Sequence, residues 1–283
     1  MSDWENLRHF AMLGREGTLS AAARALGVDH VTVARRVAAL EAETGLKLVD
    51  RRTRIYQLTG EGRRIAETIA PMEEAAFAVA RAVQASKPGA RGEVSVSAPP
   101  SLANALVAPQ LFRLRTQYPD ISIKLIGEKR AASLSKREAD IALRLKRPIE
   151  PGLVTRKIGS FGFSLYGAPG YLKATPRHSF AYIAYDSEMD DTPQQKWLMA
   201  SVGGHAIVLR TNDLENQIAA ARSGLGLALL PHFRGDADAG LTRVQTDPIP
   251  VRRDVWLVVH RDLRQAPAVR AVMDFLAECL RAL

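Results

Sequence analysis

Apolar residues in the first 45 positions recur at the spacing of α-helices and predict a unit of three helices. Residues that can cap a helix precede each of them, at Ser2 or Asp3, at Thr18 and at Asp29. Gly27 and Gly45 follow the second and third helices and are expected to end them. Two short helices joined by a turn can place the second of the pair in the major groove of DNA.

The third predicted helix has an apolar face and a polar face. Val33, Val37 and Leu40 fall at positions i, i+4 and i+7, so they are expected to pack inward. The side chains able to contact bases or phosphates are His30, Val31, Thr32, Arg35 and Arg36. An ordinary helical hairpin has the same apolar spacing, so this stretch alone leaves both interpretations open. The residues that follow favour DNA contact.

A short basic β-hairpin, or wing, is predicted after Gly45 and completes a domain of residues 1–58. Its arginines, at positions suited to phosphates or a minor groove, are Arg51, Arg52 and Arg54. An arginine-rich turn is usually only solvated. The position of this turn directly after a helix-turn-helix favours contact with DNA.

Residues 59–87 are predicted to form one long helix that pairs with a second copy of the chain. Their apolar residues step by 4, 3, 4, 3 and 4, the heptad spacing of a coiled coil: Ile65, Ile69, Met72, Ala76, Val79 and Val83. Pro71 lies inside this pattern, so a kink near Glu67 or a break in the helix is expected. Residues 88–92 contain one proline and two glycines and are predicted to be a hinge.

From Glu93 onward, strand and helix patterns alternate and predict an α/β domain over residues 93–283. The first series reads as strand, helix, strand, short helix and strand, with its first helix at Ser101–Gln117. Two further strands are expected at Leu153–Ile158 and Gly162–Gly167, before a second series and a final helix over 266–283.

This pattern predicts two lobes of parallel sheet covered by helices, with a cleft between them. The first lobe is expected at about residues 93–160 and 264–283, and the second at about residues 161–263. A cleft between two lobes is a common place for a small ligand.

Composition narrows the possible functions. Lys and Arg number 39 against 30 Asp and Glu, and the excess gathers beside the third predicted helix, which suits a polyanionic partner. The absence of an export signal or membrane span predicts a cytoplasmic protein. The one cysteine, Cys279, excludes an internal disulfide. No catalytic motif or metal-ligand spacing is present, so neither an enzyme, a metal site nor a cofactor is expected.

The sequence resembles the LysR-type transcriptional regulators over nearly its whole length. The segments that carry the resemblance are LRHFAMLGREGTLSAAARALGV, VARRVAALEAETGLKLVDR, LTGEGRRI, QYPDISIKL, ADIALRL, PGLVTRKIG, GAPGYL and SGLGLALLP. The resemblance implies a winged helix-turn-helix, a linker-helix dimer that is commonly assembled into a tetramer, and a two-lobed α/β effector domain like a type 2 periplasmic binding protein. It implies double-stranded DNA, a small-molecule effector and RNA polymerase as partners in a bacterial cell.

The chain departs from the family pattern at the third helix. A typical member reads roughly Val-Ser-Gln-Pro-Ala-Leu-Ser-Arg where this chain has the eight residues Val28–Arg35. The departures are at Asp29, His30, Val31 and Ala34. They leave the scaffold intact, but an operator sequence cannot be borrowed from relatives.

Candidate effector-binding residues lie at the ends of the predicted strands: Pro100, Ser101, Gly127, Glu128, Arg144, Phe161, Asn212 and Asp213. Free N–H groups at the start of the helix after Pro100, together with the Ser101 hydroxyl, could hold a carboxylate, although Ser101 could equally be a simple cap. Asp213 would repel an acid, so helix capping is its expected role.

Two classes of function remain at this point. The first is a ligand-responsive DNA-binding regulator, indicated by the helix-turn-helix, the basic wing and the heptad spacing together. The second is a two-lobed carrier or enzyme in which the helix-turn-helix is only an accessory domain. The lack of an export signal argues against a carrier, and the lack of a catalytic constellation argues against an enzyme.

Overall fold

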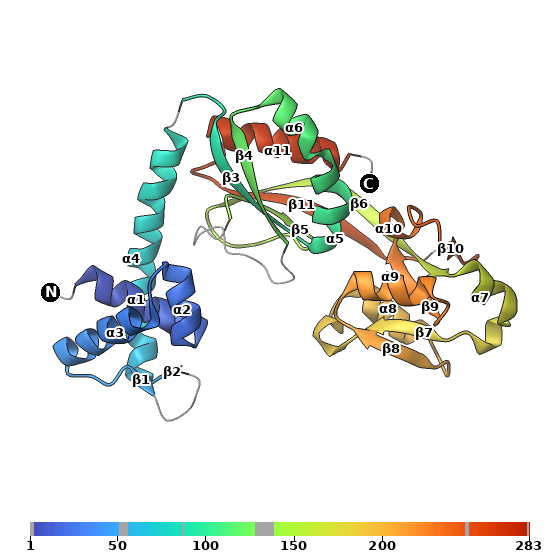
Figure 1. Ribbon diagram of the computed structural model, residues 1–283, viewed down its shortest axis with the longest axis horizontal. Helices are drawn as coiled ribbons and strands as arrows, with labels where there is room; N and C mark the ends of the chain where they lie inside the picture. Colours follow the sequence, from blue (N-terminus) through green and yellow to red (C-terminus); the bar gives the residue numbers. More distant parts are fainter. Residues whose placement is uncertain (1–2, 51–55, 87, 128–138, 247–248, 282) are drawn as a thin grey trace. The chain divides into compact units, whose positions relative to one another are not determined.

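The computed structural model describes residues 3–50, 56–86, 88–127, 139–246, 249–281 and 283 (Figure 1). The chain divides into two compact units, Met1–Val83 and Gln84–Leu283. The candidate residues Arg51, Arg52, Arg54 and Glu128 lie outside the described residues.

The first unit contains the three predicted helices, a short hairpin and most of a long helix. Its elements are α1 (Trp4–Glu16), α2 (Leu19–Leu26), α3 (His30–Thr44), β1 (Val49–Asp50), β2 (Gln57–Leu58) and α4 (Gly60–Ala85). The predicted caps are confirmed, since Asp3, Thr18 and Asp29 each accept a backbone N–H bond at a helix start. Gly27 and Gly45 end their helices with φ of 70° and 67°, a conformation that favours glycine.

Small residues allow the three helices to pack closely. Ala22 and Ala23 of α2 are buried beside Phe10 of α1 and beside Val33 and Leu40 of α3. Because the alanine side chain ends at Cβ, the α2 backbone can approach α1 and α3 closely. The apolar face of α3 is buried in this core. The opposite face of α3 is therefore the one left to solvent.

Contacts with α3 and α4 hold the base of the wing. Oε1 of Glu41 accepts hydrogen bonds from Leu48 N at 2.9 Å and Val49 N at 3.1 Å, which ties β1 to α3. On the other side, Thr59 N donates to the Leu48 carbonyl at 3.0 Å. Gly62 in the first turn of α4 lies so close that a Cβ there would meet the Leu48 oxygen at 2.1 Å.

Helix α4 continues from Gly60 to Ala85 with Pro71 inside it, so of the two predicted alternatives, a kink or a break, the break is wrong. Proline removes one N–H donor, and the carbonyl four residues earlier belongs to Glu67. Both residues are exposed, so water can bond that carbonyl.

The predicted heptad residues divide into two groups along α4. Ile69 is only 2% exposed and lies in the core of the first unit, and Ile65 packs against that core. Met72, Val79 and Val83 are exposed large apolar residues, and Ala76 between them is exposed as well. Ile65 and Ile69 therefore stabilise the fold of the first unit.

The second unit is built on a mixed sheet with the order β4-β3-β5-β11-β6-β9-β7-β8, and β10 pairs with β6. The strands are β3 (Gly92–Ala98), β4 (Ile121–Gly127), β5 (Ile141–Arg144), β6 (Leu153–Gly167), β7 (Tyr182–Tyr185), β8 (Ile207–Thr211), β9 (Leu227–Pro231), β10 (Thr242–Arg243) and β11 (Arg252–His260). The predicted parallel pairing is confirmed for β3 with β4 and β5, and for β7 with β8 and β9.

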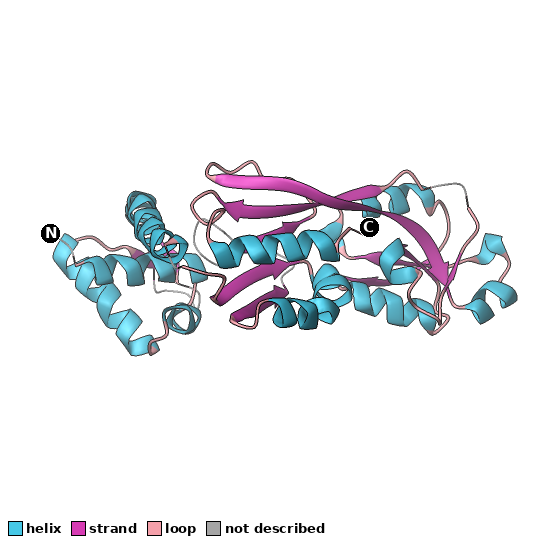
Figure 2. Ribbon diagram, turned by 90° about the horizontal axis from the view of Figure 1, so that it is seen from above, coloured by secondary structure: helices cyan, strands magenta, loops and turns pink. Residues whose placement is uncertain are grey.

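Two long antiparallel strands, β6 and β11, run through both lobes of this unit (Figures 1 and 2). The prediction of two strands at 153–158 and 162–167 is wrong, because β6 continues from Leu153 to Gly167. Pairing with β11 extends across the residues expected to form a turn. Trp256–Val259 pair with β5, so this part of β11 lies in the sheet of the first lobe, although the boundary predicted at residue 263 placed it in the second.

Helices cover the faces of this sheet. They are α5 (Pro100–Leu102), α6 (Leu111–Gln117), α7 (Pro169–Ala174), α8 (Pro193–Ser201), α9 (Leu214–Arg222), α10 (His232–Gly235) and α11 (Pro267–Cys279), with 3₁₀ turns at Arg177–Ser179 and Ser187–Met189. The single helix predicted over Ser101–Gln117 is wrong: a π turn (Ala103–Val107) and a 3₁₀ turn (Ala108–Gln110) separate α5 from α6. Pro109 lies in the 3₁₀ turn, where its missing N–H interrupts an α-helical ladder.

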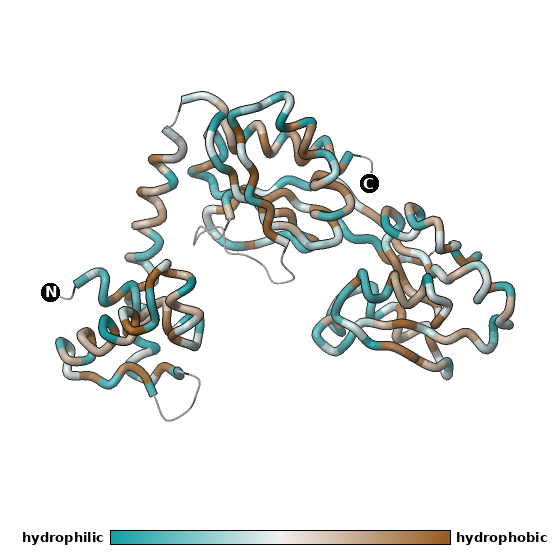
Figure 3. The backbone as a smooth tube through the Cα atoms, viewed as in Figure 1, coloured by the Kyte–Doolittle hydropathy of each residue, from teal (hydrophilic) through white to brown (hydrophobic). Residues whose placement is uncertain are grey.

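The core of the second unit follows its central strands. Val94 and Val96 of β3, Leu143 of β5, Val255 of β11 and Leu229 of β9 belong to one buried cluster. Hydrophobic stretches, brown in Figure 3, coincide with these central strands. The strands are buried on both faces by helices, as is typical of α/β domains.

Candidate DNA-binding surface and ligand cavity

The start of α3 presents a mixed polar and apolar surface to solvent. His30 and Arg35 are exposed, and Val31 is 62% exposed. Neither His30 nor Arg35 makes a side-chain hydrogen bond or ion pair within the part of the chain that the structure describes. These two side chains are therefore available to an external partner.

Asp29 fixes the first turn of α3. Its Oδ1 accepts the Thr32 N–H at 2.7 Å, and its Oδ2 accepts the Thr32 hydroxyl proton at 3.0 Å. The backbone hydrogen bond from Thr32, followed by the side-chain one, holds the pKa of Asp29 below its usual value. Thr32 therefore has its hydroxyl proton engaged, and only its methyl group and oxygen lone pairs remain for a base.

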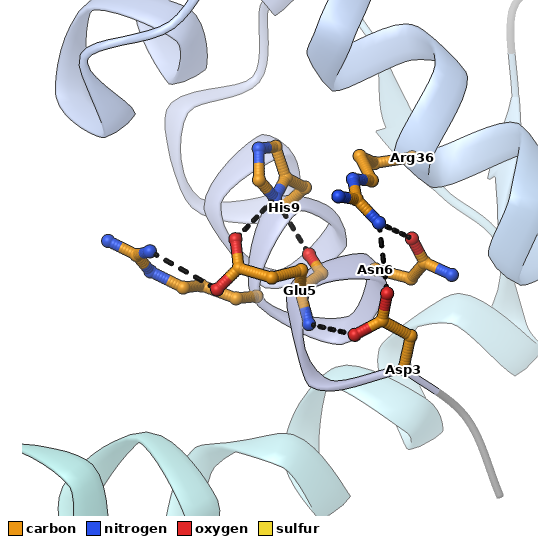
Figure 4. Close-up of polar contacts among 6 residues, drawn as sticks. Asp3, Glu5, Asn6, His9 and Arg36 are labelled. Atoms are coloured by element: carbon orange, nitrogen blue, oxygen red, sulfur yellow. Dashed lines mark hydrogen bonds and ion pairs between the residues drawn. The ribbon is translucent and has the colours of Figure 1, made fainter.

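Arg36 is bound to the start of α1. Its Nη1 donates to Asp3 Oδ2 at 2.9 Å and to Asn6 Oδ1 at 3.3 Å (Figure 4). The close-up shows Glu5 and His9 on the adjacent turns of α1, where His9 Nδ1 lies 2.7 Å from the Glu5 carbonyl oxygen. Arg36 thus joins α3 to α1, which leaves Arg35 as the freer of the two arginines.

Glu41 was not among the predicted site residues. It holds the base of the wing by accepting the backbone N–H groups of Leu48 and Val49. A glutamate after a buried leucine gives no local signal of this role, because its partners are backbone groups beyond the end of the helix.

A cavity of about 710 Å³ opens in the second unit between residues of both lobes. Six predicted effector residues line it: Pro100, Ser101, Arg144, Phe161, Asn212 and Asp213. Gly127 lies beside Pro100, where a Cβ would meet Pro100 Cγ at 3.8 Å, and it is outside the cavity lining. The lining brings together chain segments separated by more than one hundred residues.

The helix start at Ser101 offers fewer donors than the sequence suggested. Helix α5 has only three residues, and Leu102 N and Ala103 N both donate to the Pro99 carbonyl at 3.0 Å. Pro100 has no N–H, so the Ser101 N–H and hydroxyl are what this loop can offer a ligand. The predicted role of Asp213 is confirmed, since its Oδ1 caps α9 by accepting the Glu215 N–H at 2.8 Å.

The polar cavity residues that were not predicted from the sequence include Tyr185 of β7, Gln194 of α8 and Arg253 of β11. Arg253 Nη1 donates to Gln194 Oε1 at 2.8 Å, and Nη2 donates to the Leu145 carbonyl at 3.4 Å. The pair Arg252–Arg253 at the start of a strand was a usable signal, because successive strand residues point to opposite faces.

Burial shapes the protonation of this cluster. It raises the pKa of Tyr185 to about 12, with the nearby Asp213 charge adding to the effect, so this hydroxyl keeps its proton. Burial also lowers the pKa of Arg253 below its ordinary value, while Tyr185 opposes that shift. An arginine stays protonated in any case, so the cavity holds a fixed positive charge beside a neutral hydroxyl.

The described ranges contain neither a metal-binding cluster nor a membrane-spanning helix. No group of three or more His, Cys, Asp and Glu residues there is placed to hold a metal ion. No helix in the same ranges is long and apolar enough to cross a membrane.

Comparison with known proteins agrees with this two-unit arrangement. Residues 4–63 match the family model of the bacterial regulatory helix-turn-helix protein, lysR family, and residues 87–281 match the LysR substrate binding domain. The Mau operon transcriptional activator of Paracoccus denitrificans is 28% identical over 276 residues, covering 98% of this chain and 96% of that protein. The AhcY transcriptional activator HvrB of Rhodobacter capsulatus is 33% identical, covering 79% of this chain and 77% of that protein.

The fold has solved counterparts as well. The full-length structure of the Vibrio cholerae virulence activator AphB superposes with a TM-score of 0.65 at 22% identity, covering 98% of this chain and 99% of that one. The relatives are named as transcriptional regulators, and this chain is a regulator rather than an enzyme. The protein belongs to the LysR family of transcriptional regulators.

Proposed function

We propose that this regulator binds operator DNA through the exposed start of α3 and that a small molecule in the cavity of the second unit modulates this binding. The observation that carries the DNA part is the free, exposed pair His30 and Arg35 at the start of a capped helix. The observation that carries the effector part is the cavity of about 710 Å³ lined from both lobes.

Each exposed residue at the start of α3 has a role in this proposal. Arg35 binds a guanine edge or a phosphate, and His30 hydrogen-bonds a base or phosphate. Val31 and the Thr32 methyl contact thymine methyl groups. The wing arginines Arg51, Arg52 and Arg54 bind phosphates or the minor groove. Arg36 contributes by holding α3 against α1 rather than by reading a base.

Dimerisation is proposed to use the second part of the predicted heptad pattern. Met72, Ala76, Val79 and Val83 are exposed on α4, whereas Ile65 and Ile69 pack within the first unit. Such a stripe is short, so further contacts are needed, in keeping with a tetramer. Contact with RNA polymerase on DNA in the cytoplasm would complete the regulatory function.

The effector would act by shifting the population of two lobe arrangements. Strands β6 and β11 connect the two lobes, so bending of these strands changes the cavity and the lobe positions together. A ligand that binds one arrangement better favours that arrangement, which alters operator binding or DNA bending through the assembled protein.

A gel-shift assay tests the DNA part, with DNA from upstream of the gene for this protein and of its neighbours. We expect salt-sensitive, sequence-selective binding that Arg35→Ala weakens by about 1–3 kcal/mol. Arg264→Ala is the control, because Arg264 is an exposed arginine of the second unit. Absence of selective binding by the wild-type protein would overturn the proposal.

A further inference from the structure

Arg253 places a positive charge in the cavity without a carboxylate partner. Its guanidinium is half-buried, and its hydrogen bonds go to two neutral oxygens, those of the Gln194 side chain and the Leu145 backbone. Among the described residues, no Asp or Glu forms an ion pair with it. A charge removed from water in this way is costly unless an anion accompanies it.

The other charges around the cavity are engaged or exposed. Glu215 pairs with Arg234 at 2.6 Å, and Asp213 caps α9. The Arg147 guanidinium lies 5.4 Å from the ring centroid of Trp256, while Lys146 and Glu150 are exposed. Arg144 donates to Ser97 and to the Leu143 carbonyl. Arg253 is therefore a half-buried cavity cation whose described partners leave its charge uncompensated.

Two neutral donors lie near this charge. The Tyr185 hydroxyl keeps its proton and makes no hydrogen bond to any other residue that the structure describes. Gln194 is 5% exposed, lines the cavity and accepts a hydrogen bond from Arg253 with its Oε1. Its amide NH₂ group therefore points away from Arg253 and remains a neutral donor. A guanidinium beside a phenol O–H supplies the charge-assisted hydrogen bonds that a carboxylate accepts.

Another part of the cavity wall is apolar. Phe161 and Phe163 lie with ring centroids 5.5 Å apart and both line the cavity. Ile149 also lines the cavity and is 95% exposed. This part of the cavity suits a hydrocarbon or aromatic body.

We propose that the effector is an organic carboxylate whose acidic group is bound by Arg253 and Tyr185 and whose apolar body packs against Phe161 and Phe163. The proposal rests on the proposed function, in which this cavity holds the effector. It assigns acid recognition to β11 and β7 of the cavity wall, and the short helix start at Ser101 has at most a supporting role.

Titration of the full-length protein with benzoate and with its neutral isostere benzamide tests this assignment by calorimetry. We expect benzoate to bind about tenfold or more tightly than benzamide, since a hydrogen bond to a charged group in a buried site is worth that much. Arg253→Gln should weaken benzoate by about tenfold or more and leave benzamide unchanged, and Arg253→Lys should recover part of the loss. Tyr185→Phe should weaken benzoate several-fold, about one hydrogen bond.

Arg252→Gln is the matched control. Arg252 adjoins Arg253 in β11, but it is exposed and its Nη2 donates to Ser160 Oγ at 2.9 Å outside the cavity. Its benzoate affinity should equal that of the wild type. Near-ultraviolet circular dichroism verifies folding, and Tyr185→Phe carries the test if Arg253→Gln is misfolded.

Two outcomes with the wild type would overturn the inference: no benzoate binding, or equal affinity for benzoate and benzamide. A third is unchanged benzoate affinity in folded Arg253→Gln. If Arg253→Gln is misfolded, unchanged benzoate affinity in Tyr185→Phe takes its place. A gel shift on the same preparations separates this inference from the proposed function. If selective DNA binding persists in these cases, only the acid assignment falls. If the wild type shows no selective DNA binding while benzoate binds through Arg253, the proposed function falls instead.

Discussion

Replacing Gly62 with alanine should destabilise the first unit, although alanine is normally the better helix former. The new Cβ would lie 2.1 Å from the Leu48 carbonyl oxygen and 3.0 Å from its carbon, both backbone atoms. Leu48 cannot move away freely, because its N–H bonds Glu41 and its carbonyl accepts Thr59 N. Overpacking of this kind costs about 1–3 kcal/mol. Separation of β1 from α4 would add about 1 kcal/mol for the lost hydrogen bond.

The higher helix propensity of alanine stabilises the unit by at most about 1 kcal/mol, so the net decrease in the free energy of unfolding is about 1–3 kcal/mol. Hydrogen exchange of the full-length protein, followed by mass spectrometry on peptides from residues 3–50, measures this unit separately. We expect exchange limited by opening of the unit to accelerate by about 5- to 150-fold. Gly60→Ala is the control, because a Cβ at Gly60 meets nothing within 4 Å. Equal protection of both variants would refute the reasoning about the contact with Leu48.

Three further results follow from contacts in the first unit. Glu41→Ala removes the acceptor of two wing N–H groups, so a gel shift should show weaker operator binding, whereas Glu43→Ala, at an exposed position, should bind normally. Val79→Glu places a charge in the exposed apolar stripe, at a residue that is 66% exposed, so sedimentation equilibrium should show a weaker dimer. Ala70→Glu, on the opposite side of α4, should leave the dimer affinity unchanged. Equal weakening by both variants would argue against dimerisation through the stripe. Because hydrogen bonds lower the pKa of Asp29, its stabilising contribution is complete above pH 3.8 and is lost as the pH falls through the lower folded value; an NMR titration of its carboxyl with a midpoint at or above 3.8 would contradict this.

Sequence reasoning succeeded where the decisive contacts are local. The caps at Thr18 and Asp29 bond to N–H groups three residues ahead, so residue type and spacing were enough to predict them. It failed where the partner is distant. Arg253 meets Gln194 across 59 positions, and no pattern within a single strand or helix indicates that meeting. Six of the eight predicted cavity residues were found because strand ends meet at a cleft.

Two prolines show how tertiary context decides local structure. A kink or a break was expected at Pro71, and the break is excluded because α4 continues through this residue, with Ile69 of the preceding turn buried in a core. A continuous helix was expected through Pro109, but π and 3₁₀ turns replace it. Two separate strands were expected at 153–158 and 162–167, and pairing with β11 instead keeps β6 as one extended strand. Each outcome depends on neighbours that are remote in sequence.

The uninterrupted helix α4 has a consequence for the evolution of operators. The same helix contributes Ile69 to the core of the first unit and bears the exposed Val79 ten residues later, about 15 Å along its axis. A dimer joined at this stripe would fix the phase of its two reading units relative to the DNA helix. Operators should therefore tolerate spacing changes of about one full DNA turn far better than changes of half a turn, which carry one half-site to the opposite side of the duplex.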